Sequence, residues 1–151
     1  MKTKVGIVGA TGYTGSELLR FLIHHPKIEI TALTSQKYAG IEIGQVFPAL
    51  TNQIQIKCEE LSAERISEKT DFLFTAVPHK TAMEIVPVFY RKGKRIVDLS
   101  ADFRLKDANI YEKWYQKHAA VDLLPEAVYG LPELHRDKIR TAKIVGNPGC
   151  Y

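Results

Sequence analysis

The chain has 151 residues, of which 45% are hydrophobic and 25% charged, and a formal net charge of +4. This length and composition predict one ordinary globular domain, and no apolar run approaches the roughly 18 residues of a membrane-spanning helix. Two cysteines, scattered basic residues and a start without a signal-peptide pattern indicate a cytoplasmic protein with no disulfide framework, membrane partner or nucleic-acid partner. We also expect no metal site, because the adjacent pair His24–His25 is poorly placed to ligate one ion.

The first predicted feature is a glycine-rich turn between a strand and a helix. The apolar run Val5–Val8 predicts a buried strand, and residues 16–23 have the apolar spacing of a helix. Gly9, Gly12 and Gly15 stand between them, at every third position. Glycine lets the backbone approach a pyrophosphate closely, and the N-terminus of a helix attracts the anion.

The glycine spacing, G-x-x-G-x-x-G, differs from the usual G-x-G-x-x-G of dinucleotide-binding units. An ordinary turn with incidental glycines is the alternative, but the flanking strand and helix favour a nucleotide-binding loop. We expect cofactor contacts from the residues of this turn: Gly9, Thr11, Gly12, Tyr13, Thr14 and Gly15.

A second buried strand is predicted at residues 28–34, and its end bears on the choice of cofactor. In a site for NAD, an Asp or Glu stands at this point and binds the ribose 2′-hydroxyl. This chain has Ser35 and Lys37 instead, a hydroxyl and a cation that suit a 2′-phosphate. We therefore expect NADP (NADPH), the alternative being a neutral loop without preference.

The middle of the chain continues as alternating elements. The pattern predicts, in order, an irregular loop at 39–51, a half-buried strand at 53–58, a short helix at 59–68, a strand at 71–77, a helix at 81–92 and a strand at 95–99. Repeated βα units predict a Rossmann-like, doubly wound α/β fold, with a mainly parallel sheet and helices on both faces.

Two polar segments follow predicted strands, at the edge where such folds bind their ligands. Pro78 and His79 follow the first of them, so we expect both near the cofactor, with a backbone-capping role for His79 equally open. Residues 98–104, Asp-Leu-Ser-Ala-Asp-Phe-Arg, follow the second. Charges there are costly unless exposed or paired, so either the loop is salt-bridged or Arg104 binds a phosphate or carboxylate.

The last part of the chain leads to Cys150. Residues 108–118 predict a helix, 129–133 a turn-rich segment and 142–145 a strand. Cys150 then stands where a helix would normally begin. Helix N-termini favour the thiolate form of cysteine, which is the nucleophile, but position alone is equally compatible with an inert cysteine.

Four segments together resemble the N-acetyl-γ-glutamyl-phosphate reductases of arginine biosynthesis, which belong with the aspartate-semialdehyde dehydrogenases: residues 9–15, 98–104, 129–133 and 146–151. These enzymes reduce an acyl phosphate, a small-molecule substrate, with NADPH to N-acetylglutamate 5-semialdehyde and phosphate. The resemblance implies that Cys150 is the catalytic nucleophile and forms a thioester, and that Arg104 holds the substrate phosphate.

The resemblance also implies a domain organisation. Family members are much longer, and their second domain carries the catalytic histidine and the oligomer interface. We therefore expect residues 1–151 to be the NAD(P)-binding domain of a homo-oligomer, ending at the catalytic cysteine, able to bind NADP but inactive alone. The alternatives are an aspartate-semialdehyde dehydrogenase and a non-catalytic nucleotide-binding module.

Overall fold

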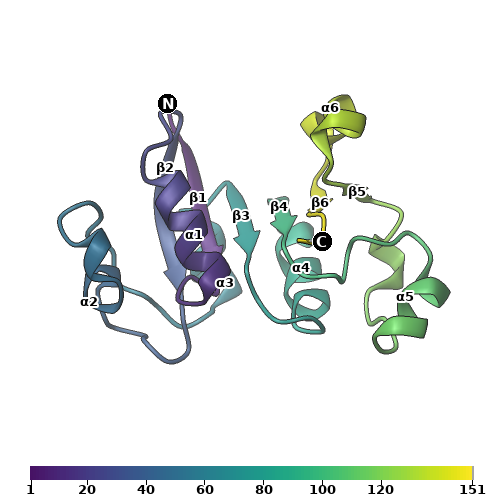
Figure 1. Cartoon of the computed structure of the whole chain (residues 1–151), viewed down its shortest axis with the longest axis horizontal. Coiled ribbons are helices and arrows are strands. Elements are labelled where there is room, and N and C mark those ends of the chain that lie inside the picture. Colours follow the sequence, from purple (N-terminus) through teal and green to yellow (C-terminus); the bar gives the residue numbers. More distant parts are fainter. Residues whose placement is uncertain (151) are drawn as a thin grey trace. The chain divides into compact units, whose positions relative to one another are not determined.

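The computed structural model describes residues 1–150, so the final position of the resembling segment 146–151, Tyr151, lies outside the described residues. The chain forms two compact units, which divide between Ala76 and Val77. Figure 1 shows the order of the elements along the chain. Each unit contains three parallel strands with helices around them, as described in turn below.

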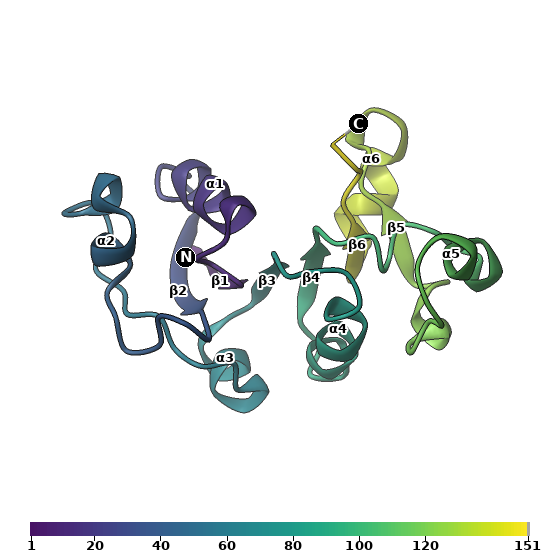
Figure 2. The same ribbon diagram turned by 60° about the horizontal axis from the view of Figure 1, so that its bottom comes forward.

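The first unit is built on the strands β1 (Thr3–Val8), β2 (Ile28–Thr34) and β3 (Phe72–Thr75). All pair in parallel in the order β2-β1-β3, with Val5 opposite Ile30 on one side and Phe72 on the other. Helix α1 (Tyr13–Leu22) covers one face and α3 (Ala63–Lys69) the opposite face (Figures 1 and 2). This unit therefore has the layered, parallel α/β arrangement that the sequence predicts.

Residues 39–62 of the first unit contain little regular structure. They include the short helix α2 (Ile43–Val46) and the 3-10 turn η1 (Pro48–Leu50). The strand predicted at 53–58 is wrong, because this segment makes only isolated bridges, such as that between Glu42 and Lys57. Its alternating apolar residues, Ile54 and Ile56, pack instead on the core cluster around Ile7 and Leu33. The alternation of apolar and polar residues arises here because one side of an extended segment is buried, and the segment belongs to no sheet.

The second unit is built on β4 (Arg95–Asp98), β5 (Ala127–Tyr129) and β6 (Ile144–Gly146). They pair in parallel in the order β4-β6-β5. Its helical elements are α4 (Ala82–Arg91), α5 (Ala108–Trp114), the 3-10 turn η2 (Val121–Leu123) and α6 (Pro132–Thr141). Helix α4 packs on β4, and α6 packs on β5.

Helix α4 follows its prediction closely. Met83, Val86 and Phe89 form its buried face, and the chain leaves the helix at Gly93, whose φ of 75° is readily adopted by glycine. Helix α5 ends at Trp114, earlier than predicted.

Strand β5 and helix α6 are absent from the sequence prediction, which has a turn-rich segment at 129–133. Pro132 is instead the first residue of α6, a position that suits its fixed φ and missing N–H.

Within the described residues, no helix is long and apolar enough to cross a membrane.

Candidate functional site

The glycine-rich turn leads from β1 into α1, with Gly12 as the N-cap residue of the helix. Gly15 is buried against the turn itself, since a Cβ at this position would lie 2.5 Å from the carbonyl oxygens of Gly9 and Ala10. Only glycine fits there without moving backbone. A Cβ at Gly12 would have Gly9 as its nearest neighbour, at 3.7 Å. The third glycine therefore shapes the turn, and the second leaves open space beside the helix N-terminus.

The beginning of α1 offers free backbone donors. Within residues 1–150, the backbone N–H groups of Tyr13, Thr14 and Gly15 have no hydrogen-bond acceptor, whereas Ser16 donates to the Gly12 carbonyl. These groups stand at the positive end of the helix dipole. The first unit thus has the unpaired donors and the absence of side-chain bulk that a pyrophosphate requires.

The end of β2 is tied directly to this turn. Thr34 accepts from Gly9 N through Oγ1 at 3.2 Å, and the Thr11 and Ser35 hydroxyls lie 2.8 Å apart. Ser35 Oγ also accepts from Tyr38 N at 3.2 Å, which closes the loop after the strand. Ser35 is buried, and its hydroxyl is already bonded to Thr11 and Tyr38, so it has a structural role in this loop.

Lys37 is exposed on the same loop, with Nζ 5.0 Å from the centre of the Tyr38 ring. No carboxylate pairs with it among the described residues. The backbone of Glu59 forms an isolated β-bridge with Thr34 at the end of β2, and its carboxylate is already paired with Lys69 Nζ at 2.9 Å. The loop after β2 therefore presents a free cation, and the nearby acid is neutralised.

In the second unit, the exposed His79 follows β3 and contacts the loop after β4. Its Nδ1 accepts a hydrogen bond from Ala101 N at 3.0 Å, and its ring meets that of Tyr115 edge-on at 5.4 Å. An Nδ1 that accepts from an N–H leaves the ring proton on Nε2. The backbone-binding alternative for His79 is therefore realised, and the ring still presents an N–H donor.

The two aspartates of segment 98–104 are buried. Ser100 donates to the Asp98 carboxylate from Oγ at 2.7 Å and from its backbone N at 3.2 Å. The Asp102 carboxylate accepts from backbone N–H groups and a tyrosine hydroxyl, and no cation pairs with it in the part of the chain that the structure describes. At Asp102 the salt-bridged alternative is thus wrong, because hydrogen-bond donors replace the cation.

Arg104 connects this loop to the segment that leads to Cys150. Its Nε donates to the carbonyl of Asn147 at 2.6 Å and its Nη2 to that of Leu99 at 2.9 Å. The backbone N of Asn147 donates in turn to the Asp98 carbonyl at 2.8 Å. No carboxylate neutralises the guanidinium among residues 1–150, so its charge remains available to an anion.

The two cysteines differ sharply. Cys58 is buried, and burial raises the pKa of its thiol, as expected for a packing residue. Cys150 is exposed, beyond the end of β6 and three residues after Asn147. A Cβ at Gly146 would overlap the Phe103 carbonyl, so this segment passes very close to the loop that carries Arg104. In the part of the chain that the structure describes, the Cys150 thiol is thus accessible, whereas that of Cys58 is not.

Sequence reasoning missed two buried residues of this region, Tyr111 and His118. The Tyr111 hydroxyl donates to Asp102 at 2.8 Å, and His118 Nε2 lies 2.8 Å from the Asp102 carbonyl oxygen. Burial, followed by the hydrogen bond to Asp102, raises the pKa of Tyr111. No local spacing marks these residues as partners of Asp102, since they follow it by nine and sixteen positions.

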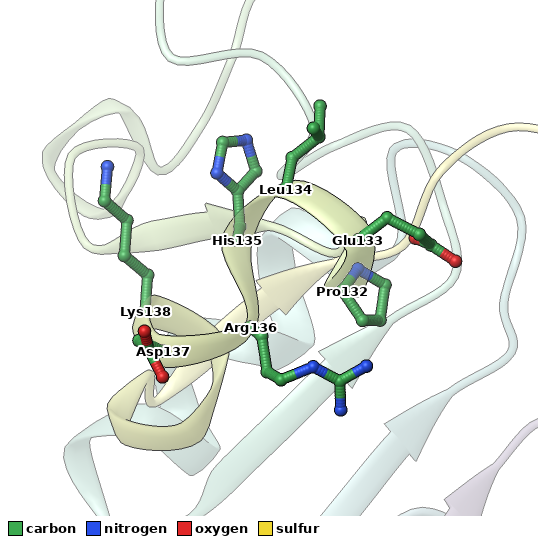
Figure 3. A pocket seen from close by; sticks show the side chains of 7 residues that line it. All are labelled: Pro132, Glu133, Leu134, His135, Arg136, Asp137 and Lys138. Carbon is green, nitrogen blue, oxygen red and sulfur yellow. The ribbon is translucent and has the colours of Figure 1, made fainter.

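A hollow of about 460 Å³ lies elsewhere in the second unit, against residues 132–138 of α6. Figure 3 shows its side chains extending outward from one stretch of helix, where His135 departs from helical geometry (φ −128°, ψ 22°). The hollow includes none of the predicted site residues. Among the described residues, no three His, Cys, Asp or Glu side chains gather in a way that could hold a metal ion.

Comparison with known proteins finds relatives in one family. Residues 4–142 match the family model described as semialdehyde dehydrogenase, NAD binding domain. Two curated relatives, each named N-acetyl-gamma-glutamyl-phosphate reductase, are 53% identical in Desulfotalea psychrophila and 55% identical in Geotalea daltonii. The alignments cover 98% of this chain but 43% of each relative, so the chain spans less than half of their length.

Solved structures share the fold. Aspartate semialdehyde dehydrogenase II from Vibrio cholerae, complexed with ASA, aligns at 16% identity with a TM-score of 0.69, covering 99% of this chain and 42% of that one. Aspartate semialdehyde dehydrogenase with NADP from Candida albicans aligns at 26% identity with a TM-score of 0.61, covering 72% and 32%. The predicted Rossmann-like α/β fold class is confirmed.

Proposed function

The chain belongs to the semialdehyde dehydrogenase family, whose NAD-binding domain it matches, and we propose that it is the cofactor-binding part of an NADPH-dependent N-acetyl-γ-glutamyl-phosphate reductase. The relatives above support this activity by their names and identities. The observation that carries the proposal is the hydrogen bond from Arg104 to Asn147, which places an unneutralised cation on the segment of the exposed Cys150.

In this proposal, the residues of the first unit hold the dinucleotide. The free N–H groups of Tyr13, Thr14 and Gly15 receive the pyrophosphate. Lys37 supplies the charge for a 2′-phosphate, and Ser35 supports the loop through Thr11 and Tyr38. The Candida albicans enzyme, solved with NADP, supports NADP over NAD. Bound NADPH supplies the hydride for the reduction.

The residues of the second unit carry the chemistry. The Cys150 thiolate attacks the acyl carbon of the substrate, the bond from that carbon to the phosphate oxygen breaks, and inorganic phosphate leaves. The resulting thioester at Cys150 is electrophilic enough to accept a hydride. Release of the aldehyde then restores the thiolate.

Arg104 binds the leaving phosphate in this scheme. A guanidinium has five N–H donors, and two of them bind the carbonyls of Asn147 and Leu99, so three remain for an anion. A cofactor contact of the exposed His79 remains part of the proposal, supported by its position in the chain after β3 and by the N–H donor that its Nε2 presents.

The test is an assay of the intact protein in the reverse, phosphate-dependent direction, with N-acetylglutamate 5-semialdehyde and aspartate semialdehyde offered separately. We expect turnover of the first and replacement of Cys150 by serine to reduce it by at least about a thousandfold. Cys58→Ala, which alters the buried thiol, is the matched control and retains activity. Preference for aspartate semialdehyde would overturn the substrate assignment, and full activity of Cys150→Ser would favour a non-catalytic role for this residue.

A further inference from the structure

The Asp102 carboxylate accepts hydrogen bonds from three residues. Its oxygens accept from Lys80 N at 3.0 and 3.1 Å, from Met83 N at 3.1 Å and from the Tyr111 hydroxyl at 2.8 Å. Lys80 and Met83 flank the N-cap of α4, whose positive end favours a carboxylate. A fully buried anion is thereby satisfied without a cation.

The main chain of Asp102 is fixed as firmly as its side chain. Its N–H donates to Ser100 Oγ at 3.1 Å, and its carbonyl oxygen lies 2.8 Å from His118 Nε2. His118 Nδ1 accepts from Ala120 N at 3.1 Å, so the ring proton is on Nε2 and is donated to Asp102. Both ring nitrogens of this buried histidine are therefore used in its neutral form.

These contacts lie just before Arg104 in the chain. Arg104 is two residues beyond Asp102, and the intervening Phe103 is buried with its ring edge-on to His118 at 5.7 Å. The backbone N–H groups of Ser100, Ala101 and Asp102 are thus all hydrogen-bonded to side chains before the chain reaches Arg104. Arg104 itself is only partly buried, and its guanidinium donates to the carbonyls of Asn147 and Leu99.

We propose that Asp102, together with Tyr111 and His118, is a positioning unit that orients Arg104 toward the substrate phosphate. The inference rests on the proposed function, because it assumes that Arg104 binds this phosphate. Capping of α4 alone would need only an acceptor for Lys80 and Met83. The additional bonds from Tyr111 and His118 come from a different part of the chain, and they act on the residue that precedes Phe103 and Arg104.

The test is a double-mutant cycle in the intact protein, with the KM for inorganic phosphate measured in the reverse direction. Asp102→Asn removes one acceptor oxygen and introduces an N–H facing other donors, and Tyr111→Phe removes a single donor but leaves the α4 cap. We expect the KM for phosphate to rise on the order of tenfold for Asp102→Asn and about threefold for Tyr111→Phe, with kcat changed by less than about threefold.

The same substitutions are then made in an Arg104→Ala background. If Asp102 and Tyr111 act through Arg104, they change the KM for phosphate by less than about twofold there. Equal effects in both backgrounds would overturn the inference and leave the proposed function intact. An unchanged KM in Arg104→Ala alone would instead overturn the phosphate-binding role of Arg104, and the inference with it.

Two features keep the test decisive. Tyr111→Phe retains the backbone contacts of Asp102, so its cycle decides the matter if Asp102→Asn does not fold. Tyr90→Phe is the matched control, because it also removes a tyrosine hydroxyl bonded to a carboxylate, that of Glu126 at 3.3 Å. We expect this control to leave the KM for phosphate unchanged, and a rise equal to that of Tyr111→Phe would overturn the inference.

Discussion

The guanidinium of Arg104 donates from Nε to the main-chain oxygen of Asn147 at 2.6 Å. The same side chain reaches the Leu99 carbonyl at 2.9 Å, so one residue connects the loop after β4 with the segment after β6. Both acceptors are backbone groups that need a partner wherever water is excluded. Arg104 therefore has a structural role in addition to its proposed contact with the substrate.

Replacement of Arg104 by alanine should lower the free energy of unfolding by about 2–3 kcal/mol, because two charge-assisted hydrogen bonds are lost and their carbonyls are left unpaired. Urea unfolding followed by circular dichroism measures the change. Arg136→Ala is the control, since Arg136 is exposed on α6, and should cost less than about 0.5 kcal/mol. If Arg104→Ala lowers the free energy of unfolding no more than Arg136→Ala does, the two Arg104 hydrogen bonds do not stabilise the fold.

Gly15 and Gly12 should separate a packing role from a ligand-binding role. A methyl group at Gly15 overlaps the carbonyls of Gly9 and Ala10, so Gly15→Ala should destabilise the fold by about 1–3 kcal/mol and weaken NADPH binding. Gly12→Ala meets no neighbour closer than 3.7 Å and should change stability by less than about 1 kcal/mol.

Fluorescence titration with NADPH completes this comparison. We expect Gly12→Ala to raise the Kd by at least about tenfold, because its methyl group occupies the space beside the free N–H groups of α1. Wild-type affinity in a stable Gly12→Ala protein would mean that the pyrophosphate does not bind at this turn.

Lys37→Ala should weaken the binding of NADPH but not that of NADH. Loss of its charge is expected to raise the Kd for NADPH by about tenfold and to leave the Kd for NADH unchanged, since only NADPH carries the 2′-phosphate. Lys27→Ala, at the opposite end of β2, is the control for net charge. Parallel losses for both cofactors, or the same loss for Lys27→Ala, would argue against 2′-phosphate recognition by Lys37.

The buried Tyr111 predicts a loss of stability in alkali. Burial, and then the bond to Asp102, raise its pKa above the ordinary value of 10.0. The folded state therefore keeps the phenolic proton while the unfolded state releases it, so this contribution to stability is complete below about pH 10 and falls as the pH rises further.

Unfolding measured from about pH 9 to 11 should consequently decline less steeply for Tyr111→Phe than for the wild type. Tyr90 and Cys58 also have raised pKa values, but they are present in both proteins and cancel in the comparison. Identical slopes would show that Tyr111 ionises equally easily in both states.

Features with a local signal were predictable from the sequence. The strand at 28–34 was predicted with its observed bounds, because β-branched residues run between two polar segments. The glycine turn and the buried face of α4 follow from spacing in the same way. The apolar alternation at 53–58 misled, because an extended segment with one buried side produces the pattern of a half-buried strand.

Long-range partners left no such signal. Asp102 was recognisable as a costly charge, but its donors at Lys80, Met83, Tyr111 and His118 become neighbours only through the fold. Helix α6 has no buried residue, so it lacks the apolar stripe by which helices are recognised. Its remaining signal was Pro132 followed by Glu133 in the first turn, with basic residues in the last.

The proposed activity depends most directly on covalent chemistry at Cys150. The intact protein, incubated with N-acetylglutamate 5-semialdehyde and oxidised cofactor in the absence of phosphate, should accumulate the acyl group as a thioester. Peptide mass spectrometry after acid quenching should find this acyl adduct on the peptide that contains Cys150, and added phosphate should remove it. An adduct on Cys58, or phosphate-dependent turnover that survives the replacement of Cys150 by serine, would contradict the account.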